Sequence, residues 1–564
     1  MVLRGRVHPG EYHDSVRLMR VAASVRALDG VEEVGVLMGS PANRELFVEA
    51  GLGFDGIDGA TPDDVVVAVR GSSESAVEAA LDAAEELLRT PQGSRRGIVY
   101  PTVESALRDA PGGAVGLITV PGEHAAAEAR KLLEAGHPVM VFSDNVDVAD
   151  EVVLKQLAHE RGTVLLGSDC GTVMLGGLGL GFANQVPTGP VGVVAASGTG
   201  AQVVATTVAA LGSGVSHMVG LGGRDLDDEV AGISLFDGLA ALEKDPTTEV
   251  VVVVGKQIGR RTLGRLLEVV GSMRTPVVTC LFGQGNAWVS RLVGAWPASS
   301  LAEAGQVAVR LATGDLPGHS GDPVDLVAVG ERRRELGPGR VLRGVFAGGT
   351  LAQEALQVAR AVLDEVSSNL DGAVGTAGHS IVDLGSDEFT KGRPHPMLDP
   401  EAQAERIRGF GADATVGAIL LDLVLGHGAH EDPGPLLAAS VAAARERAAA
   451  EGRELLVVAS VCGTDLDPQD AGRQREALRS AGVVVMESAR AALFAALCVA
   501  DETEQAAADA RAATWLRRPE AVVSVGSTWF SDAVEAQGAD VLHVDWRPPA
   551  GGDPELMDIL DRLD

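Results

Sequence analysis

The stretch VGVVAASGTG, residues 191–200, decides the fold of this chain because it joins an apolar strand to a helix through a turn of small residues. The apolar run that starts at Val191 predicts a strand, and the small-residue turn after it leads to Thr199 beside the start of a helix. A second junction, GVFAGGT at residues 344–350, has the same plan. Each junction predicts unpaired backbone N–H groups at the positive end of a helix dipole, which is a site for an anion. The residues that we expect to bind phosphate here are Ser197, Gly198, Thr199, Gly348, Gly349 and Thr350.

Short apolar runs alternate with helical segments rich in Ala, Glu and Arg along most of the chain, which is typical of parallel α/β domains. The strands and turns recur in the same order in two large segments, which indicates a divergent internal duplication. We expect a small α/β domain at 1–95, a Rossmann-like domain at 100–188, flavodoxin-like domains at 189–315 and 340–500, a Pro/Gly-rich connector at 315–340 and a C-terminal segment at 515–564.

The composition excludes several classes of protein. The 564 residues carry a formal net charge of −32, which disfavours binding to nucleic acid or to an anionic membrane. No apolar stretch reaches the ~20 residues that span a bilayer, and the first residues lack the apolar region of a signal peptide. The four cysteines form no CxxC pair, so we expect buried thiols in a cytoplasmic protein and no metal site.

Two histidine-containing loops are candidate catalytic segments. In GRPHP, residues 392–396, two prolines restrict the backbone around Arg393 and His395. Arg393 is able to grip a carboxylate or phosphate, and His395 is able to transfer a proton. An ordered surface loop is the alternative interpretation. In GHGAHEDP, residues 426–433, His427 and His430 follow a strand end, and a phosphate- or partner-facing loop is favoured there over a metal site.

Three further residues are candidates for the same site. Arg224, in GGRD at residues 222–225, and Lys256, after the predicted strand at 250–254, are candidates to supply positive charge for a phosphate, with a solvated surface position as the alternative. His379, in GHSIVD at residues 378–383, is a further candidate to face the site.

Several of these segments resemble a known family. GSDCG at 167–171, the junction at 191–199 and GLGGR at 220–224 are similar to the α subunit of succinyl-CoA synthetase, and residues 410–500 to the C-terminal domain of its β subunit. Over the whole chain, segments 10–19, 39–43, 392–400 and 427–433 resemble the FdrA family. The resemblance implies a succinyl-CoA synthetase fold. It also implies a subunit of a carbamoyltransferase like oxamate carbamoyltransferase, in a hetero-oligomer with other subunits and with a homodimer as a further expectation.

The chain departs from the ligase pattern at one loop. The ligase α subunit carries its phosphorylated histidine after a strand that corresponds to residues 276–282, whereas this chain reads GQGNAW at 283–288. The N-terminal unit also lacks the glycine signature that binds CoA. These departures favour carbamoyl phosphate or phosphate as the ligand and argue against CoA. The alternatives are a nucleotide-dependent acyl-CoA synthetase and a non-catalytic scaffold of a multi-subunit enzyme.

Overall fold

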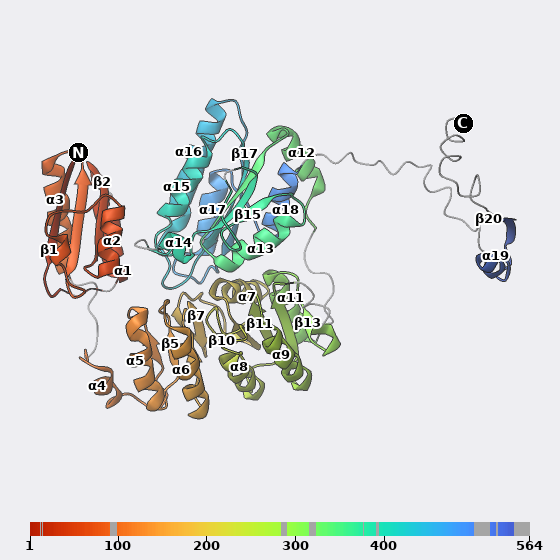
Figure 1. Cartoon of the computed structure of the whole chain (residues 1–564), viewed down its shortest axis with the longest axis horizontal. Coiled ribbons are helices and arrows are strands. Elements are labelled where there is room, and N and C mark those ends of the chain that lie inside the picture. The colour runs from red at the N-terminus through yellow and green to blue at the C-terminus, as the bar shows by residue number, and fades with distance from the viewer. Residues whose placement is uncertain are drawn as a thin grey trace, which may run out of the picture. The chain divides into compact units, whose positions relative to one another are not determined.

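The computed structural model describes residues 1–11, 13, 15–26, 28–90, 99–283, 290–314, 323–375, 377–390, 394–500, 519, 521–525 and 528–545 (Figure 1). The chain forms two compact units, Met1–Ala500 and Asp501–Asp564. The expected fold class is confirmed: several α/β domains are built on parallel sheets, and a small α/β domain precedes them. Within the described ranges, every helix is too short or too polar to cross a bilayer.

The N-terminal domain is an antiparallel sheet of order β1-β3-β2. One face packs against α1 and α3, and its core includes Leu18, Val67 and Leu81. The sequence pattern predicts β2, β3, α1 and α3, but it missed β1, whose residues are only partly buried. The elements are β1 (Val2–His8), α1 (Ser15–Arg26), β2 (Val31–Met38), α2 (Pro41–Glu49), η1 (Ile57–Gly59), β3 (Val65–Gly71) and α3 (Glu74–Arg89).

The next segment builds a small parallel sheet of order β4-β5-β6. Helices α5 and α6 pack against each other, and their apolar residues share a core with β5. The elements are α4 (Val103–Leu107), β4 (Gly116–Ile118), α5 (Gly122–Glu134), β5 (Val139–Val141), α6 (Val148–Glu160) and β6 (Leu165–Leu166).

The segment 172–314, called the first half below, forms a sheet of order β13-β12-β11-β9-β10-β7-β8. Strands β9 and β11 lie at its centre and are buried along their whole length. The glycine-rich segment 171–181 forms the antiparallel hairpin β7–β8 at the sheet edge. The elements are β7 (Thr172–Leu175), β8 (Leu178–Gly181), β9 (Val191–Ala195), α7 (Gly198–Ala210), β10 (Val215–Gly220), α8 (Ile233–Lys244), β11 (Val250–Gly255), α9 (Arg260–Ser272), β12 (Val277–Leu281), β13 (Trp296–Pro297) and α11 (Leu301–Thr313).

The segment 326–500, called the second half, forms a parallel sheet of order β15-β16-β14-β17-β18-β19. Its first helix, α12, lies in the stretch expected to be a connector. The elements are α12 (Leu326–Leu336), β14 (Val341–Phe346), α13 (Gly349–Arg360), β15 (Val366–Ser368), β16 (His379–Asp383), α14 (Asp387–Thr390), α15 (Glu401–Phe410), β17 (Val416–Val424), α16 (Pro433–Ala450), β18 (Leu456–Cys462), α17 (Ala471–Ser480), β19 (Val484–Met486) and α18 (Ser488–Val499).

The two halves share one strand order. In the first half the run is β10-β9-β11-β12-β13, and in the second it is β16-β14-β17-β18-β19. Both runs follow the flavodoxin-like order 2-1-3-4-5, in which ligands bind at the carboxyl ends of the strands, where the order reverses. That point lies between β9 and β11 in one half and between β14 and β17 in the other, and each sequence junction begins there.

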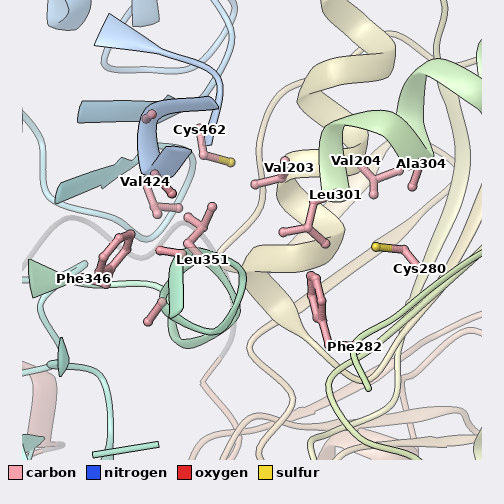
Figure 2. Packing of buried hydrophobic residues seen from close by; sticks show 14 of the residues in the cluster. Val203, Val204, Cys280, Phe282, Leu301, Ala304, Phe346, Leu351, Val424 and Cys462 are labelled. Carbon is pink, nitrogen blue, oxygen red and sulfur yellow. The ribbon is translucent and has the colours of Figure 1, made fainter. Parts of the chain in front are cut away.

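The halves are joined by a common hydrophobic core. Figure 2 shows Val203, Leu301 and Phe282 of the first half close to Leu351 and Val424 of the second, and all of them belong to one cluster of buried residues. Cys280 and Cys462 also lie in this cluster. All four cysteines are buried free thiols, as expected. The shared core fixes how the carboxyl ends of the two sheets face each other.

The second unit is small. Strands β20 (Ala521–Val525) and β21 (Asp540–Val544) are parallel, and α19 (Thr528–Glu535) packs against them. The tail that follows residue 545 lies outside the described residues.

Candidate functional site

The two glycine junctions meet. The hydroxyl oxygen of Ser197, which caps α7, lies 2.5 Å from the hydroxyl oxygen of Thr350 in the first turn of α13. A Cβ added to Gly348 would lie 2.9 Å from the methyl carbon of Thr199, so the turns are in contact across the halves. The positive ends of two helix dipoles therefore converge on one place.

The start of α7 offers unused donors. The Ser197 side chain accepts a hydrogen bond from the amide of Gly200 at 2.9 Å, which satisfies one of the four amides that a helix start leaves unpaired. The amides of Gly198 and Thr199 have no acceptor among the residues that the structure describes. They are available to an anion.

The start of α13 is organised by a buried carboxylate. The amides of Ala347 and Gly348 donate to the two carboxylate oxygens of Asp422 at 2.7 and 2.8 Å. The amide group of Gln403 also donates to Asp422, at 3.3 Å. Burial raises the pKa of the Asp422 carboxyl to about 7. Asp422 therefore occupies the first two amides of this junction, and it leaves those of Gly349 and Thr350 without an acceptor in the described part of the chain.

Lys256 of the first half reaches the start of α13 in the second. Its Nζ lies 2.9 Å from the position that a Cβ on Gly349 would take, and the Asp383 Oδ2 atom lies 2.6 Å from the same position. No carboxylate among the described residues lies within ion-pair distance of Lys256. An ammonium group without a direct counter-ion, beside two helix N-termini, is an arrangement that a bound anion would stabilise.

His395 lies on the Asp383 side of this group. A Cβ added to Gly385 would lie 2.6 Å from the His395 Nε2 atom and 3.2 Å from the Asp383 Oδ1 atom. Its ring is 5.8 Å from the ring of Phe182 in the first half. Burial lowers the pKa of His395 to about 4, so the imidazole is neutral at physiological pH.

The Asp169 carboxyl group is a further titratable neighbour of Lys256 and Arg224. Burial, followed by the charges of Asp144 and Asp387, raises its pKa to about 6, whereas Lys256 and Arg224 lower it. Sequence reasoning did not identify Asp169, Asp383 or Asp422 as site residues. A signal existed for Asp422, since it is the single charged residue in the wholly buried strand β17.

Arg224 is engaged by the protein itself. Its guanidinium donates to Glu151 at 2.7 Å, to the hydroxyl of Ser168 at 2.6 Å and to the carbonyl of Val146 at 2.9 Å. Glu151 also pairs with Lys155, whose side chain is fully buried. These contacts tie α6 to the turn after β10. A role of Arg224 in phosphate binding stays a prediction.

The other predicted loop residues lie around the contact between the halves. His427 pairs through its backbone with Ala183, and its Nε2 lies 3.1 Å from the side-chain oxygen of Gln185. His430 accepts a hydrogen bond from the amide of Asp432 at 3.0 Å, and its own amide donates to the carbonyl of Met397. The loop that carries His427 and His430 thus lies next to the His395 loop. Catalytic roles of His427 and His430 stay predictions.

The structure does not place two of the predicted residues, Arg393 and His379, at the site. Arg393 lies outside the described residues, as do residues 284–289 of the GQGNAW loop. The expectation that His379 faces the site is wrong. It begins β16, at the opposite end of the strand from Asp383, and its Nδ1 accepts a hydrogen bond from the Leu342 amide at 3.0 Å.

Comparison with known proteins places the chain in a family. Residues 345–499 match the family model described as CoA-ligase, and residues 1–99 match the AllF heavy metal-associated domain. The Escherichia coli K12 protein YahF is 36% identical over 492 residues, which cover 86% of this chain and 95% of YahF. The chain belongs to the succinyl-CoA synthetase-like family that includes YahF.

Two further proteins are similar to part of the chain. Subunit alpha 2 of the ADP-forming succinate–CoA ligase of Archaeoglobus fulgidus is 33% identical over 189 residues, which cover 33% of this YahF-family chain and 64% of that subunit. The dinucleotide-forming acetyl-coenzyme A synthetase 1 of Ca. Korarchaeum cryptofilum has 16% identity and a TM-score of 0.29, over 72% of this chain and 87% of that one. The family relationship supports an acyl-CoA ligase fold and an enzyme of the acid–thiol ligase kind. None of these matches shows carbamoyl transfer.

The N-terminal domain of this YahF-family chain does not fit the heavy metal that its family model names. All four cysteines lie beyond residue 99, so the domain has no thiolate, the ligand that soft metals favour. In the described parts of the chain, no three His, Cys, Asp or Glu side chains are grouped to hold a metal ion. No step of the chemistry below passes through a metal in this domain.

Proposed function

We propose that this chain is an acyl-phosphate-dependent transferase within the acid–thiol ligase family. It binds the phosphoryl group of an acyl phosphate between the starts of α7 and α13, beside Lys256. The acceptor attacks the acyl carbon, the bond from that carbon to the phosphate oxygen breaks, and phosphate leaves with the electron pair. The convergence of the Lys256 ammonium with the free amides of Gly198, Thr199, Gly349 and Thr350 carries the proposal.

These groups suit the charge that develops in the reaction. The departing phosphate gains negative charge, and fixed amide dipoles with an adjacent ammonium stabilise it without reorganisation. They lie beside the core that the two halves share and are partly buried, so water screens their charge less than it does at a fully exposed surface. A free acyl phosphate is preferred over a phosphohistidine because the sequence has no histidine between His217 and His319.

Two acceptors are candidates. The family relationship favours CoA, which would turn an acyl phosphate into an acyl-CoA and phosphate. The missing loop histidine and the FdrA resemblance favour the amide nitrogen of oxamate, with carbamoyl phosphate as donor and oxalurate as product, in a complex with partner subunits. Assays of the full chain, alone and with its partners, on acetyl phosphate with CoA and on carbamoyl phosphate with oxamate distinguish the two.

Phosphate binding tests the proposal without knowledge of the acceptor. By calorimetry, Lys256→Met should weaken binding of inorganic phosphate at least about tenfold, because it removes a full positive charge that lies beside the start of α13. Lys244→Met is the matched control, since Lys244 is exposed at the end of α8, and it should bind phosphate as the wild type does. Absence of phosphate binding to the wild type, or equal binding by Lys256→Met, would contradict the proposed function.

A further inference from the structure

We propose that Asp383 accepts the proton of the attacking acceptor group, and that this group is therefore an N–H or S–H nucleophile and not a carboxylate. The inference rests on the proposed function and deepens it. Asp383 stands at the carboxyl end of β16, next to β14, whose end leads into the α13 junction.

One oxygen of the Asp383 carboxylate accepts a hydrogen bond, and the other accepts none from the residues that the structure describes. Its side chain is nearly buried, with the residue 5% exposed. The Oδ1 atom accepts a hydrogen bond from the amide of Gly385 at 2.9 Å, which fixes the orientation of the carboxylate. The Oδ2 atom has no partner among the described residues, and it lies 2.6 Å from the position of a Cβ on Gly349. An oxygen of a largely buried carboxylate, with no partner in the described part of the chain, therefore lies next to the helix start where the phosphate would bind.

The charged and titratable neighbours of Asp383 come from three elements. Lys256 follows β11, Asp422 belongs to β17, and His395 lies in the loop after α14. Burial raises the pKa of Asp383, and Lys256 opposes this effect. An anion bound to Lys256 would offset the positive charge of the ammonium and would place negative charge near the Asp383 carboxylate. Binding of the acyl phosphate would thus make Asp383 a stronger base when the acceptor attacks.

His395 can support this role as a neutral group. Its Nδ1 accepts a hydrogen bond from the amide of Met397 at 3.2 Å, so the neutral ring carries its proton on Nε2. That nitrogen faces Gly385, beside Oδ1 of Asp383. The ring therefore offers a hydrogen-bond donor on the Asp383 side without adding charge.

The arrangement selects a class of acceptor. A thiol or an amide nitrogen must lose a proton as its bond to the acyl carbon forms, and Asp383 Oδ2 is placed to take it. A carboxylate acceptor has no proton to lose and would be repelled by Asp383 and by Asp169. In the balanced step, the acceptor proton moves to Asp383, the C–S or C–N bond forms, and the acyl C–O bond breaks with both electrons going to phosphate.

Proton uptake on phosphate binding tests the electrostatic part. Calorimetry of inorganic phosphate at pH 6, in buffers of different ionisation enthalpy, should show proton uptake by the wild type. Asp383→Asn should bind phosphate at least as tightly with clearly less uptake. Asp371→Asn, which removes an exposed carboxylate that pairs with Arg360, should match the wild type. Equal uptake in Asp383→Asn and the wild type would overturn the inference even though phosphate binds. Failure of the wild type to bind phosphate would instead remove the proposed function.

Kinetics test the catalytic part. With the donor and acceptor pair that turns over, Asp383→Asn should lower kcat about 10²–10⁴-fold with an unchanged KM for the acyl phosphate, since general-base loss has effects of this size. We also expect kcat of the wild type to rise with pH as Asp383 loses its proton, and kcat of Asp383→Asn to lack this rise. Wild-type kcat in Asp383→Asn, or efficient use of acetate as acceptor by the wild type, would overturn the assignment.

Discussion

Gly349 lies where Lys256 of the first half reaches the start of α13, beside the proposed phosphate. A Cβ at this position would lie 2.6 Å from Asp383 Oδ2 and 2.9 Å from Lys256 Nζ, so any side chain there would meet both groups. Both obstructing groups are ends of side chains and are able to move. The helix start would therefore survive a small substitution, while the space that an anion needs would not.

Gly349→Ala should weaken phosphate binding at least about tenfold and leave the melting temperature close to that of the wild type, because Ala is favourable in a helix. Calorimetry and thermal unfolding measure the two quantities. Gly264→Ala is the control, since a Cβ at this exposed position in α9 meets nothing within 4 Å. It should stabilise the fold by about 0.5–1 kcal/mol without an effect on phosphate. Unchanged phosphate binding by Gly349→Ala would contradict the placement of the anion.

The residues that the sequence could identify are those in recognisable turns. Ser197 and Thr350 stand in strand–glycine–helix junctions, whose chemistry is local. Asp383 and Asp422 could not be assigned in the same way, because their function depends on which strands lie next to β14. Sequence order does not give that neighbourhood, since β16 and β17 flank β14 only after the sheet has formed.

Helix α13 is the element that links the site to both halves. Its start forms the second junction, and its buried Glu354 accepts hydrogen bonds from the amide of Leu301 at 2.8 Å and from the hydroxyl of Ser488 at 2.5 Å. Those partners begin α11 of the first half and α18 of the second. One carboxylate therefore holds three helices together. Burial raises its pKa from 4.5 to about 7.

This raised pKa has a consequence for stability. The folded chain holds the Glu354 proton up to about pH 7, whereas the unfolded chain releases it near pH 4.5, so stability from this group falls as the pH rises through that window. Glu354→Gln should remove this fall and be more stable than the wild type at pH 8, by an amount on the order of 1–3 kcal/mol. Denaturant unfolding at pH 5 and pH 8 measures the difference.

The control for this experiment is Glu446→Gln, an exposed position on α16. It should follow the pH dependence of the wild type. If Glu354→Gln also followed it, or were less stable than the wild type at pH 8, the buried carboxyl would not titrate as described.

At the scale of the whole molecule, the two halves share one hydrophobic core. The residues Val204 and Phe282 of the first half and Leu351 and Val424 of the second belong to a single core (Figure 2). Polar contacts reinforce it, since Asn184 donates to the carbonyl of Leu425 at 2.9 Å. The periodicity of the sequence predicted both sheets and their repetition. It could not predict this contact, because buried Val, Leu and Ala residues do not specify which surface they cover.

Leu351→Ala should destabilise both halves together, by about 2–5 kcal/mol for a buried leucine. Hydrogen exchange of β9 and β17 measures the effect, and the two strands should lose protection in parallel. Leu81→Ala, in the separate core of the N-terminal domain, should leave both strands unchanged. Loss of protection in β17 while β9 keeps its own would show that the halves unfold independently.

A crystal structure of the full chain with inorganic phosphate is the most direct test of the account. We predict density between the starts of α7 and α13, within hydrogen-bond distance of the Gly198, Thr199, Gly349 and Thr350 amides and of Lys256 Nζ. Phosphate bound elsewhere, for example at Arg224, or an empty site at saturating phosphate, would contradict the claim that the two junctions form one anion site.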